Sequence, residues 1–198
     1  MRLMRKIAAI VAAGMLGGCA VGGLVGESAP ATFDLEAPQV ERMRARGIQI
    51  TVYPPVAVKT IDTVEILVKG GNGRVAYFSG AAWGDRLPAL FQARLVETLA
   101  NSGAFRAVLT NQDRVTGDLS LAIEIRDFQV DATSGAPEAV VDVYVKLVDE
   151  RTSSIITTKR FHARVAAAAP DPNAGIHALN IAFQQVAAEI TTWVARRG

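Results

Sequence analysis

The chain has 198 residues, half of them hydrophobic, which is long enough for one domain with a core of its own. Its first 18 residues hold three of the 21 lysines and arginines and no acidic side chain, so the remainder carries 18 cations against 19 acidic residues, a net charge of −1. This balance gives no reason to expect nucleic acid as a partner, and the single cysteine excludes an internal disulfide.

The chain begins with the pattern of a secretory signal peptide. Three cations stand near its start (Arg2, Arg5 and Lys6), and a run of hydrophobic and small residues follows from Ile7 to Gly18. As a helix this run is about 18 Å long, against about 30 Å for the hydrocarbon core of a bilayer. We therefore predict that residues 1–18 are a cleaved signal peptide and not a membrane-spanning helix.

The cleavage site is marked by Leu16-Gly17-Gly18 directly before Cys19. This string resembles the lipobox of bacterial lipoproteins, which implies cleavage between Gly18 and Cys19, with a diacylglycerol thioether and an N-acyl chain such as palmitate on Cys19. In lipoproteins an aspartate after the cysteine tends to retain the protein at the inner membrane. Here the next residue is Ala20, so the resemblance implies an anchor in the outer membrane, on its periplasmic face. The alternative is a free or buried structural thiol behind an ordinary signal peptide.

Residues 19–31 are rich in glycine, alanine and valine and show no sustained helical or strand period. They indicate an acylated flexible tether with a root-mean-square reach of about 20 Å. One domain is expected over residues 32–198. It begins with a short strand over 32–35, followed by a loop or short helix over 39–46.

Two further stretches predict strands. Alternation of hydrophobic and polar residues over 48–53, stopped by Pro54-Pro55, is typical of a half-buried strand. The stretches 64–69 and 74–78 flank Gly70-Gly71-Asn72-Gly73, which indicates a β-hairpin. The alternative is a phosphate-binding glycine loop, but no Lys-Ser or Lys-Thr follows, and a strand follows where that loop needs a helix.

The first predicted helix starts near residue 85. Asp85 is its expected N-cap, Pro88 fits the first turn, and Asn101-Ser102-Gly103 ends it. Its hydrophobic residues recur at helical spacing: Leu87, Leu90, Phe91, Leu95 and Leu99. A strand is expected next, over 105–109.

The rest of the chain predicts a three-stranded meander and a final helix. Alternation over 119–125 changes phase at 128, which a β-bulge near Arg126-Asp127 would absorb. Strands are expected again over 141–147 and 155–165, with turns at 133–138 and 150–154. The last helix opens at residues 170–173 and carries a hydrophobic stripe from Ile176 to Trp193. These elements predict an α+β fold, a single mainly antiparallel twisted sheet with two helices packed on one face.

Several short segments form a characteristic series along the chain. In order they are Ile48-Gln49-Ile50-Thr51-Val52, Pro54-Pro55-Val56, Ile61-Asp62, Glu65 to Lys69, Asn72, Tyr77, Trp83-Gly84-Asp85-Arg86-Leu87-Pro88, Leu95 and Leu99. Together they resemble the ABC-type transport auxiliary lipoprotein family over roughly residues 33–193. Many members have Asp-Arg after the second strand. This chain has Asp62-Thr63, so a role of that arginine does not carry over.

The resemblance implies a non-enzymatic auxiliary lipoprotein of an ABC system of the mammalian-cell-entry (MCE) type, which moves phospholipid or other lipophilic molecules across the cell envelope of a diderm bacterium. The implied partners are an MCE-domain protein, the ABC permease and ATPase, and the outer membrane. The rival hypothesis is a structural or assembly lipoprotein, of the lipopolysaccharide-assembly or barrel-plug type. Three points stay open: whether the domain itself carries lipid, whether it forms a homo-oligomer, and which surface meets a partner.

Other candidate residues favour structural roles. His162 and His177 lie in different elements, with no cysteine or paired carboxylate at ligand spacing, so no metal site and no cofactor are expected. No Gly-x-Ser-x-Gly motif marks a nucleophile, and we predict no catalytic residue. Basic residues near His162 indicate a solvated strand face more than a headgroup site: Lys159, Arg160 and Arg164. Three residues of the family-like segment are candidates for core structure or partner contact: Tyr77, Trp83 and Asp85. Trp193 is explained by the helical stripe.

Overall fold

The computed structural model describes residues 29–197. The predicted signal peptide, Cys19 and the tether up to residue 28 lie outside these described residues. The elements follow one another as β1 (Ala31–Phe33), β2 (Arg46–Val52), β3 (Val56–Ala57), β4 (Glu65–Lys69), the short 3-10 helix η1 (Gly71–Gly73), β5 (Val75–Trp83), α1 (Leu87–Asn101), β6 (Phe105–Thr110), β7 (Leu119–Asp131), β8 (Glu138–Asp149), β9 (Ser154–Ala166) and α2 (Pro172–Ala195).

The nine strands form one mixed sheet, so the prediction of a mainly antiparallel sheet is wrong. Along one side of β7 lie β2, β3 and β4 in succession, all parallel to it, and β1–β5 and β2–β6 are parallel as well. Only β4–β5, β7–β8 and β8–β9 are antiparallel. These three pairs are joined by short turns, which local sequence patterns reveal. The parallel pairs join strands that lie far apart in the chain and need long crossover connections.

The β7–β8–β9 meander is confirmed, including its bulge. The register between β7 and β8 shifts between Ile125 and Asp127, so Ile125 pairs with Val143 and Phe128 pairs with Val141. The extra residue keeps the apolar side chains on both sides of the bulge on the same face. Both Ile125 and Phe128 are buried as a result.

The strand β2 is more buried than its alternation predicts. Ile50, Thr51 and Val52 are all buried, because β2 lies between β6 and β7 and its polar side is covered as well. The loop before β7 supplies part of this cover, since a Cβ atom added to Gly117 would lie 2.8 Å from the hydroxyl of Thr51. The first two residues of β2 are exposed, Ile48 and Gln49 are partly buried, and the predicted alternation of burial is not seen.

The predicted N-cap of α1 is wrong. Arg86 is the N-cap residue, and its backbone N–H donates to the carboxylate of Asp85 at 2.6 Å, outside the helix. The first N–H of α1 is held from elsewhere in the chain, because Leu87 donates to the carbonyl of Thr63 at 3.0 Å. Pro88 has no N–H, and the N–H of Ala89 donates to the carbonyl of Arg86 at 2.9 Å, so no N–H of the first turn is left for a side-chain cap. Pro88 lies in the first turn, as expected.

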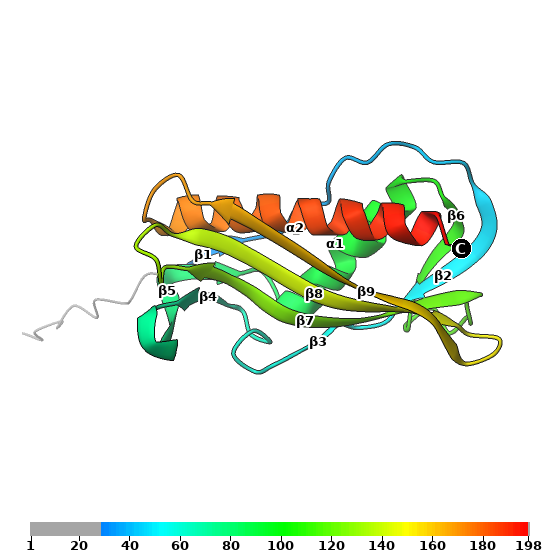
Figure 1. The fold of residues 1–198 in the computed structure, drawn as a ribbon, viewed down its shortest axis with the longest axis horizontal. Coiled ribbons are helices and arrows are strands. Elements are labelled where there is room, and N and C mark those ends of the chain that lie inside the picture. Colours follow the sequence, from blue (N-terminus) through cyan, green and yellow to red (C-terminus); the bar gives the residue numbers. More distant parts are fainter. Residues whose placement is uncertain (1–28, 198) are drawn as a thin grey trace, which may run out of the picture.

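The long helix α2 begins as predicted, with Asp171 as N-cap accepting a hydrogen bond from the N–H of Ala174 at 3.1 Å. It lies along β8 and β9, and both helices are on the same side of the meander (Figure 1). Phe183 of α2 meets Phe91 of α1 edge to face, with ring centroids 5.2 Å apart. Near the start of α2, a Cβ atom on Gly175 would lie 3.0 Å from Val130, so the missing side chain lets the helix approach the sheet.

Three carboxylates hold the tight turns at the ends of strands. The hydroxyl and the N–H of Thr133 donate to Asp131 at 2.6 and 2.9 Å and hold the pKa of Asp131 below its ordinary value. The N–H of Thr152 lowers the pKa of Asp149 in the same way, and that of Thr110 lowers the pKa of Asp113. These carboxylates bind protons less readily in the folded chain than in the unfolded chain.

We expect acid to weaken the fold through these turns. Since the folded pKa values are lowered, the stability they contribute is present above about pH 4, the unfolded value, and is lost as the pH falls through the lower folded values. Asp131→Asn and Thr133→Val should each reduce the free energy of unfolding at pH 7 and flatten its decline in acid. Urea titrations between pH 7 and pH 2 measure both quantities. An unchanged slope in both variants would show that this turn is not linked to folding.

Candidate functional site

Several of the family-like residues meet at one corner, where α1 begins. The hydroxyl of Tyr77 donates to the carbonyl of Thr60 at 3.3 Å, and the N–H of Trp83 donates to the carbonyl of Val64 at 2.7 Å. The guanidinium of Arg86 forms a bidentate ion pair with Asp62, with Nε 2.9 Å from Oδ1. These bonds tie the loop between β3 and β4 to β5 and to the first turn of α1.

Two of the three candidate contact residues are placed by this corner. Trp83 is 3 % exposed and lies edge to face with Phe128, with ring centroids 6.0 Å apart, so it is part of the core. Asp85 is exposed and caps no helix. Tyr77 is partly buried. Tyr77 and Trp83 therefore have structural roles at this corner, through the hydrogen bonds to Thr60 and Val64.

The outer face of the meander is a row of ion pairs. Arg160 holds Asp142 through Nε, 3.0 Å from Oδ1 and 2.9 Å from Oδ2, and this carboxylate raises the pKa of Arg160. Asp142 is buried beneath its partner. Arg164 pairs with Glu138 at 2.9 Å. The predicted solvated face is confirmed for Arg160, His162 and Arg164, all of which are exposed.

The two histidines do not come together. His162 lies on the outer face of β9, and His177 lies on the exposed side of α2, which packs on the opposite face. Within residues 29–197 no group of three or more His, Cys, Asp or Glu side chains is placed to hold a metal ion.

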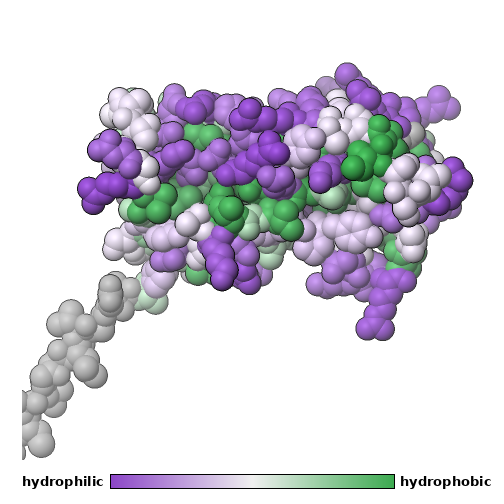
Figure 2. Space-filling view, turned by 60° about the horizontal axis from the view of Figure 1, so that its bottom comes forward, coloured by the Kyte–Doolittle hydropathy of each residue, from purple (hydrophilic) through white to green (hydrophobic). Residues whose placement is uncertain are grey.

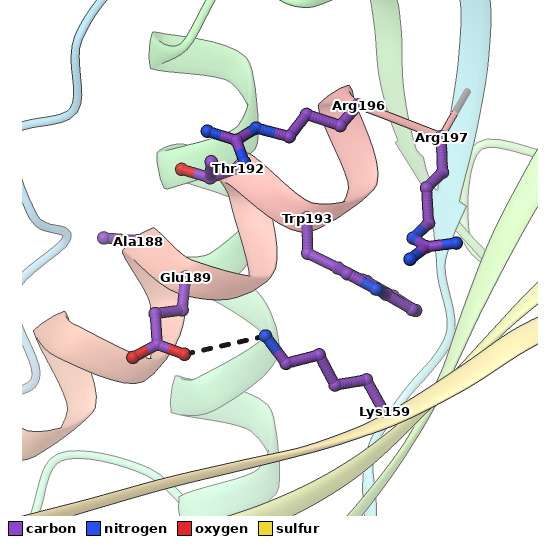
Figure 3. A pocket seen from close by; sticks show the side chains of 7 residues that line it. All are labelled: Lys159, Ala188, Glu189, Thr192, Trp193, Arg196 and Arg197. Carbon is purple, nitrogen blue, oxygen red and sulfur yellow. Dashed lines mark ion pairs between the residues drawn. The ribbon is translucent and has the colours of Figure 1, made fainter.

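A groove lies between the free side of β9 and the last turns of α2. Its volume is about 570 Å³, and its lining is Lys159, Ala188, Glu189, Thr192, Trp193, Arg196 and Arg197. Lys159 comes from β9, and the other residues come from α2 and the two positions after it. Figure 3 shows the ring of Trp193 between the side chains of Lys159 and Arg197, with Arg196 pointing away from it. We call this feature the β9–α2 groove.

The β9–α2 groove contains cations that lie over aromatic rings, and it has an excess of positive charge. The ammonium of Lys159 is 4.6 Å from the ring centroid of Phe161, and the guanidinium of Arg197 is 5.8 Å from that of Trp193. The two rings lie edge to face, 5.5 Å apart. The single acid, Glu189, is 3.9 Å from Lys159, a long ion pair between exposed groups that contributes little. The three cations exceed the one acid, so the groove attracts anionic groups.

Sequence reasoning missed this groove, although two signals pointed to it. Lys159 pairs with Val145 in the register of β8 and β9, so it is a charged residue at a position that faces the core side. Glu189 and Trp193 are four residues apart on α2, and Arg197 follows four residues later. That spacing places all three on one side of a helix.

A second, apolar hollow lies at the start of α2. Its volume is about 230 Å³, and Phe78, Val130 and Pro170 are among the residues that line it. Pockets that enclose a small-molecule ligand commonly measure about 300–1,000 Å³.

No helix among residues 29–197 is long and apolar enough to cross a membrane.

Comparison with known proteins gives a family and a fold. The model of a family described as ABC-type transport auxiliary lipoprotein component matches residues 33–191. An uncharacterized protein of Bradyrhizobium diazoefficiens is 29% identical over 177 residues. That match covers 86% of this chain and 47% of the relative, so the chain spans about half the length of this curated relative.

Two solved structures share the architecture. A protein of Xanthomonas campestris is similar with a TM-score of 0.73 and 24% identity, over 85% of this chain and 93% of that chain. A hypothetical protein of Chlamydia trachomatis has a TM-score of 0.54 and 16% identity, over 76% and 96% of the two chains. At these identities the likeness shows the fold alone.

Proposed function

The chain belongs to the ABC-type transport auxiliary lipoprotein family, as its sequence predicts, and from this premise we propose that it serves an MCE-type system that moves phospholipid or other lipophilic molecules across the cell envelope. The family is not an enzyme class, and the proposed role is non-enzymatic. The chain would be the lipid-anchored partner at the outer membrane. The MCE-domain protein, the permease and the ATPase would be other chains.

The observation that carries this proposal is the family match over residues 33–191, which follows a predicted signal peptide over residues 1–18 and a predicted lipid attachment site at Cys19. The physics of the cargo supports it. Each CH₂ of a lipid tail costs about 0.8 kcal/mol in water, so a continuous protein path between two membranes would remove a large penalty. A domain held about 20 Å from Cys19 by its tether can receive the end of such a path.

The structure favours docking over carriage of lipid by this domain. The apolar hollow at the start of α2 holds about 230 Å³, which is below the range of pockets that enclose a ligand. The side chains between the helices and the sheet are packed, with the aromatic pairs Phe91–Phe183 and Phe161–Trp193 in contact. We therefore expect no lipid to co-purify at one molecule per chain.

Photo-crosslinking in intact cells tests the proposed function. A benzophenone amino acid placed at exposed positions on different faces, such as Val58, His162 and Arg197, should capture an MCE-domain protein or a permease subunit. The buried position Leu95 is the matched control and should give no intermolecular product. Capture of only barrel-assembly or lipopolysaccharide-assembly proteins would favour the rival hypothesis and overturn this one.

A further inference from the structure

The strand β9 has an open edge beside the β9–α2 groove. It pairs with β8 alone among the described strands, and its 13 residues span about 43 Å at about 3.3 Å per residue. Such an edge offers a row of unpaired N–H and C=O groups to any extended segment that reaches it. Figure 1 shows β9 on the outside of the meander, with α2 lying along the same strands.

The first half of β9 is unusual because it is open on both faces as well as along its edge. Ile155 is 57% exposed and Ile156 is 46% exposed, whereas Phe161 and Ala163 farther along are buried beneath α2. Antiparallel strands usually bury one face. Figure 2 shows hydrophobic patches at the end of the molecule where Figure 1 places the β8–β9 turn.

The register gives the two faces of this edge different chemistry. Lys159 pairs with the buried Val145, so it lies on the helix side beside Trp193 and Arg197. Ile155 pairs with Val148 on the outer side. An added strand would therefore meet the cations Lys159 and Arg197 on the helix face. On the outer face it would meet the exposed Ile155 and Arg160, whose charge is paired with Asp142. Alternating acidic and apolar residues match this pattern, because successive side chains of a strand point to opposite faces.

We propose that the open edge of β9 over residues 154–160, with the β9–α2 groove beside it, binds an extended acidic segment of a partner protein as an added strand. Backbone pairing supplies affinity in this mode, and the groove selects the side chains. The acidic residues of the segment meet Lys159 and Arg197. This inference goes beyond the proposed function. It rests on that function in one respect only, the identity of the partner protein that carries the acidic segment.

Two other occupants fit the geometry less well. A second copy of the chain would bring β9 against β9 and add the like charges of a second Lys159 and Arg197 along the same edge, where charge repulsion opposes pairing. An anionic membrane would have to reach the groove from the far end of the domain. Figure 1 places β1, where the described chain begins, at the opposite end from the β8–β9 turn and the end of α2. With the proposed anchor at Cys19, the tether would leave the domain at the end opposite the groove.

A synthetic peptide tests the charge pattern. The probe is fluorescein-labelled (Glu-Val)₄, and its binding to the full-length acylated protein in detergent is followed by fluorescence anisotropy. We expect saturable binding that weakens with salt, and at least about tenfold weaker binding of (Lys-Val)₄. Lys159→Glu with Arg197→Glu should weaken binding of the acidic peptide by at least about tenfold. The matched control, Lys59→Glu with Arg74→Glu, reverses two exposed charges outside the groove and should leave it unchanged.

A variant that is expected to bind the peptide more tightly distinguishes a role of the groove from a loss of binding caused by misfolding. Glu189→Gln removes the one acid of the groove and should tighten binding of (Glu-Val)₄, because Lys159 loses its competing partner. Weaker binding, or none of these changes, would overturn the proposal. Equal binding of the acidic and basic peptides would overturn it as well.

N-methylation of the peptide tests strand addition. Methyl groups on all four glutamates, or on all four valines, remove the N–H groups along one edge of the peptide or the other. Strand addition requires that at least one of these two peptides loses binding, whereas attraction of charge alone leaves both unaffected and would overturn the proposed mode.

Because the peptide-binding assay needs no transport subunit, its failure is distinguishable from a failure of the crosslinking experiment. Dimers of the chain, or charge-dependent binding to phosphatidylglycerol vesicles in place of the peptide, would assign the edge to another occupant and overturn the proposal.

Discussion

Replacement of Phe183 by alanine is expected to lower the free energy of unfolding by about 3–5 kcal/mol, the range for a buried phenylalanine truncated in a core. Phe183 is fully buried in α2 and meets Phe91 of α1 with ring centroids 5.2 Å apart. The truncation leaves a cavity where the two helices and the sheet join, and it removes the edge-to-face contact. Urea unfolding followed by the fluorescence of Trp83 and Trp193 measures the loss, since both side chains are buried in the folded chain.

A matched control and a double-mutant cycle show where the loss arises. Tyr53→Ala removes an aromatic ring that is 40% exposed and should cost at most about 1 kcal/mol. Phe91→Ala combined with Phe183→Ala should reveal a coupling of about 0.5–1.5 kcal/mol between the rings. A loss below about 1 kcal/mol for Phe183→Ala would contradict the view that the junction of α1 and α2 holds the core.

Replacement of Cys19 by serine is expected to abolish acylation of the chain completely, because serine offers no thiol for a thioether. Metabolic labelling with an alkyne analogue of palmitate should mark the native protein and leave the variant unlabelled. When the variant is exported from an ordinary cleavable signal peptide, it should move from the membrane fraction to the soluble periplasm. Two acyl chains are enough for stable anchoring, at about 0.8 kcal/mol per buried CH₂.

The neighbouring residue gives the matched control for this experiment. Ala20→Asp keeps the thiol of Cys19 and should keep the label, while the resemblance to other lipoproteins implies retention at the inner membrane. The free-thiol alternative makes the opposite prediction for the native protein. A mass spectrum of the mature chain that shows an unmodified thiol at position 19, or an intact leader, would contradict the proposed anchoring and the proposed function with it.

Local patterns in the sequence predicted most elements of the fold correctly. The alternation in β7 and β8 predicted two long strands, and the change of parity after Ile125 predicted the bulge. Residues 170–173 before a stripe of period 3.6 predicted the start of α2. Each of these features depends on residues that are close in the chain, because side-chain period and capping are local properties.

The errors arose where distant segments meet. Asp85 has the right chemistry for an N-cap, but the chain makes Arg86 the N-cap residue and ties the first N–H of α1 to the distant carbonyl of Thr63. Thr51 was placed on the open side of a half-buried strand, yet the loop at Gly117 covers it. In both cases a segment far away in the sequence supplies the contact that decides the outcome.

The candidate site also has features that the sequence predicts and features that only the tertiary structure shows. The sequence by itself is enough to predict export and anchoring at Gly18 and Cys19, because a signal peptide is recognised as a linear string. Only the tertiary structure decided that β2, β3 and β4 run parallel to β7, and that Lys159 of β9 faces Trp193 and Arg197 of α2. Periodicity states which face of an element is apolar, but it does not state which neighbour covers that face. That choice depends on the packing of the whole chain and on the crossover connections that bring distant strands together.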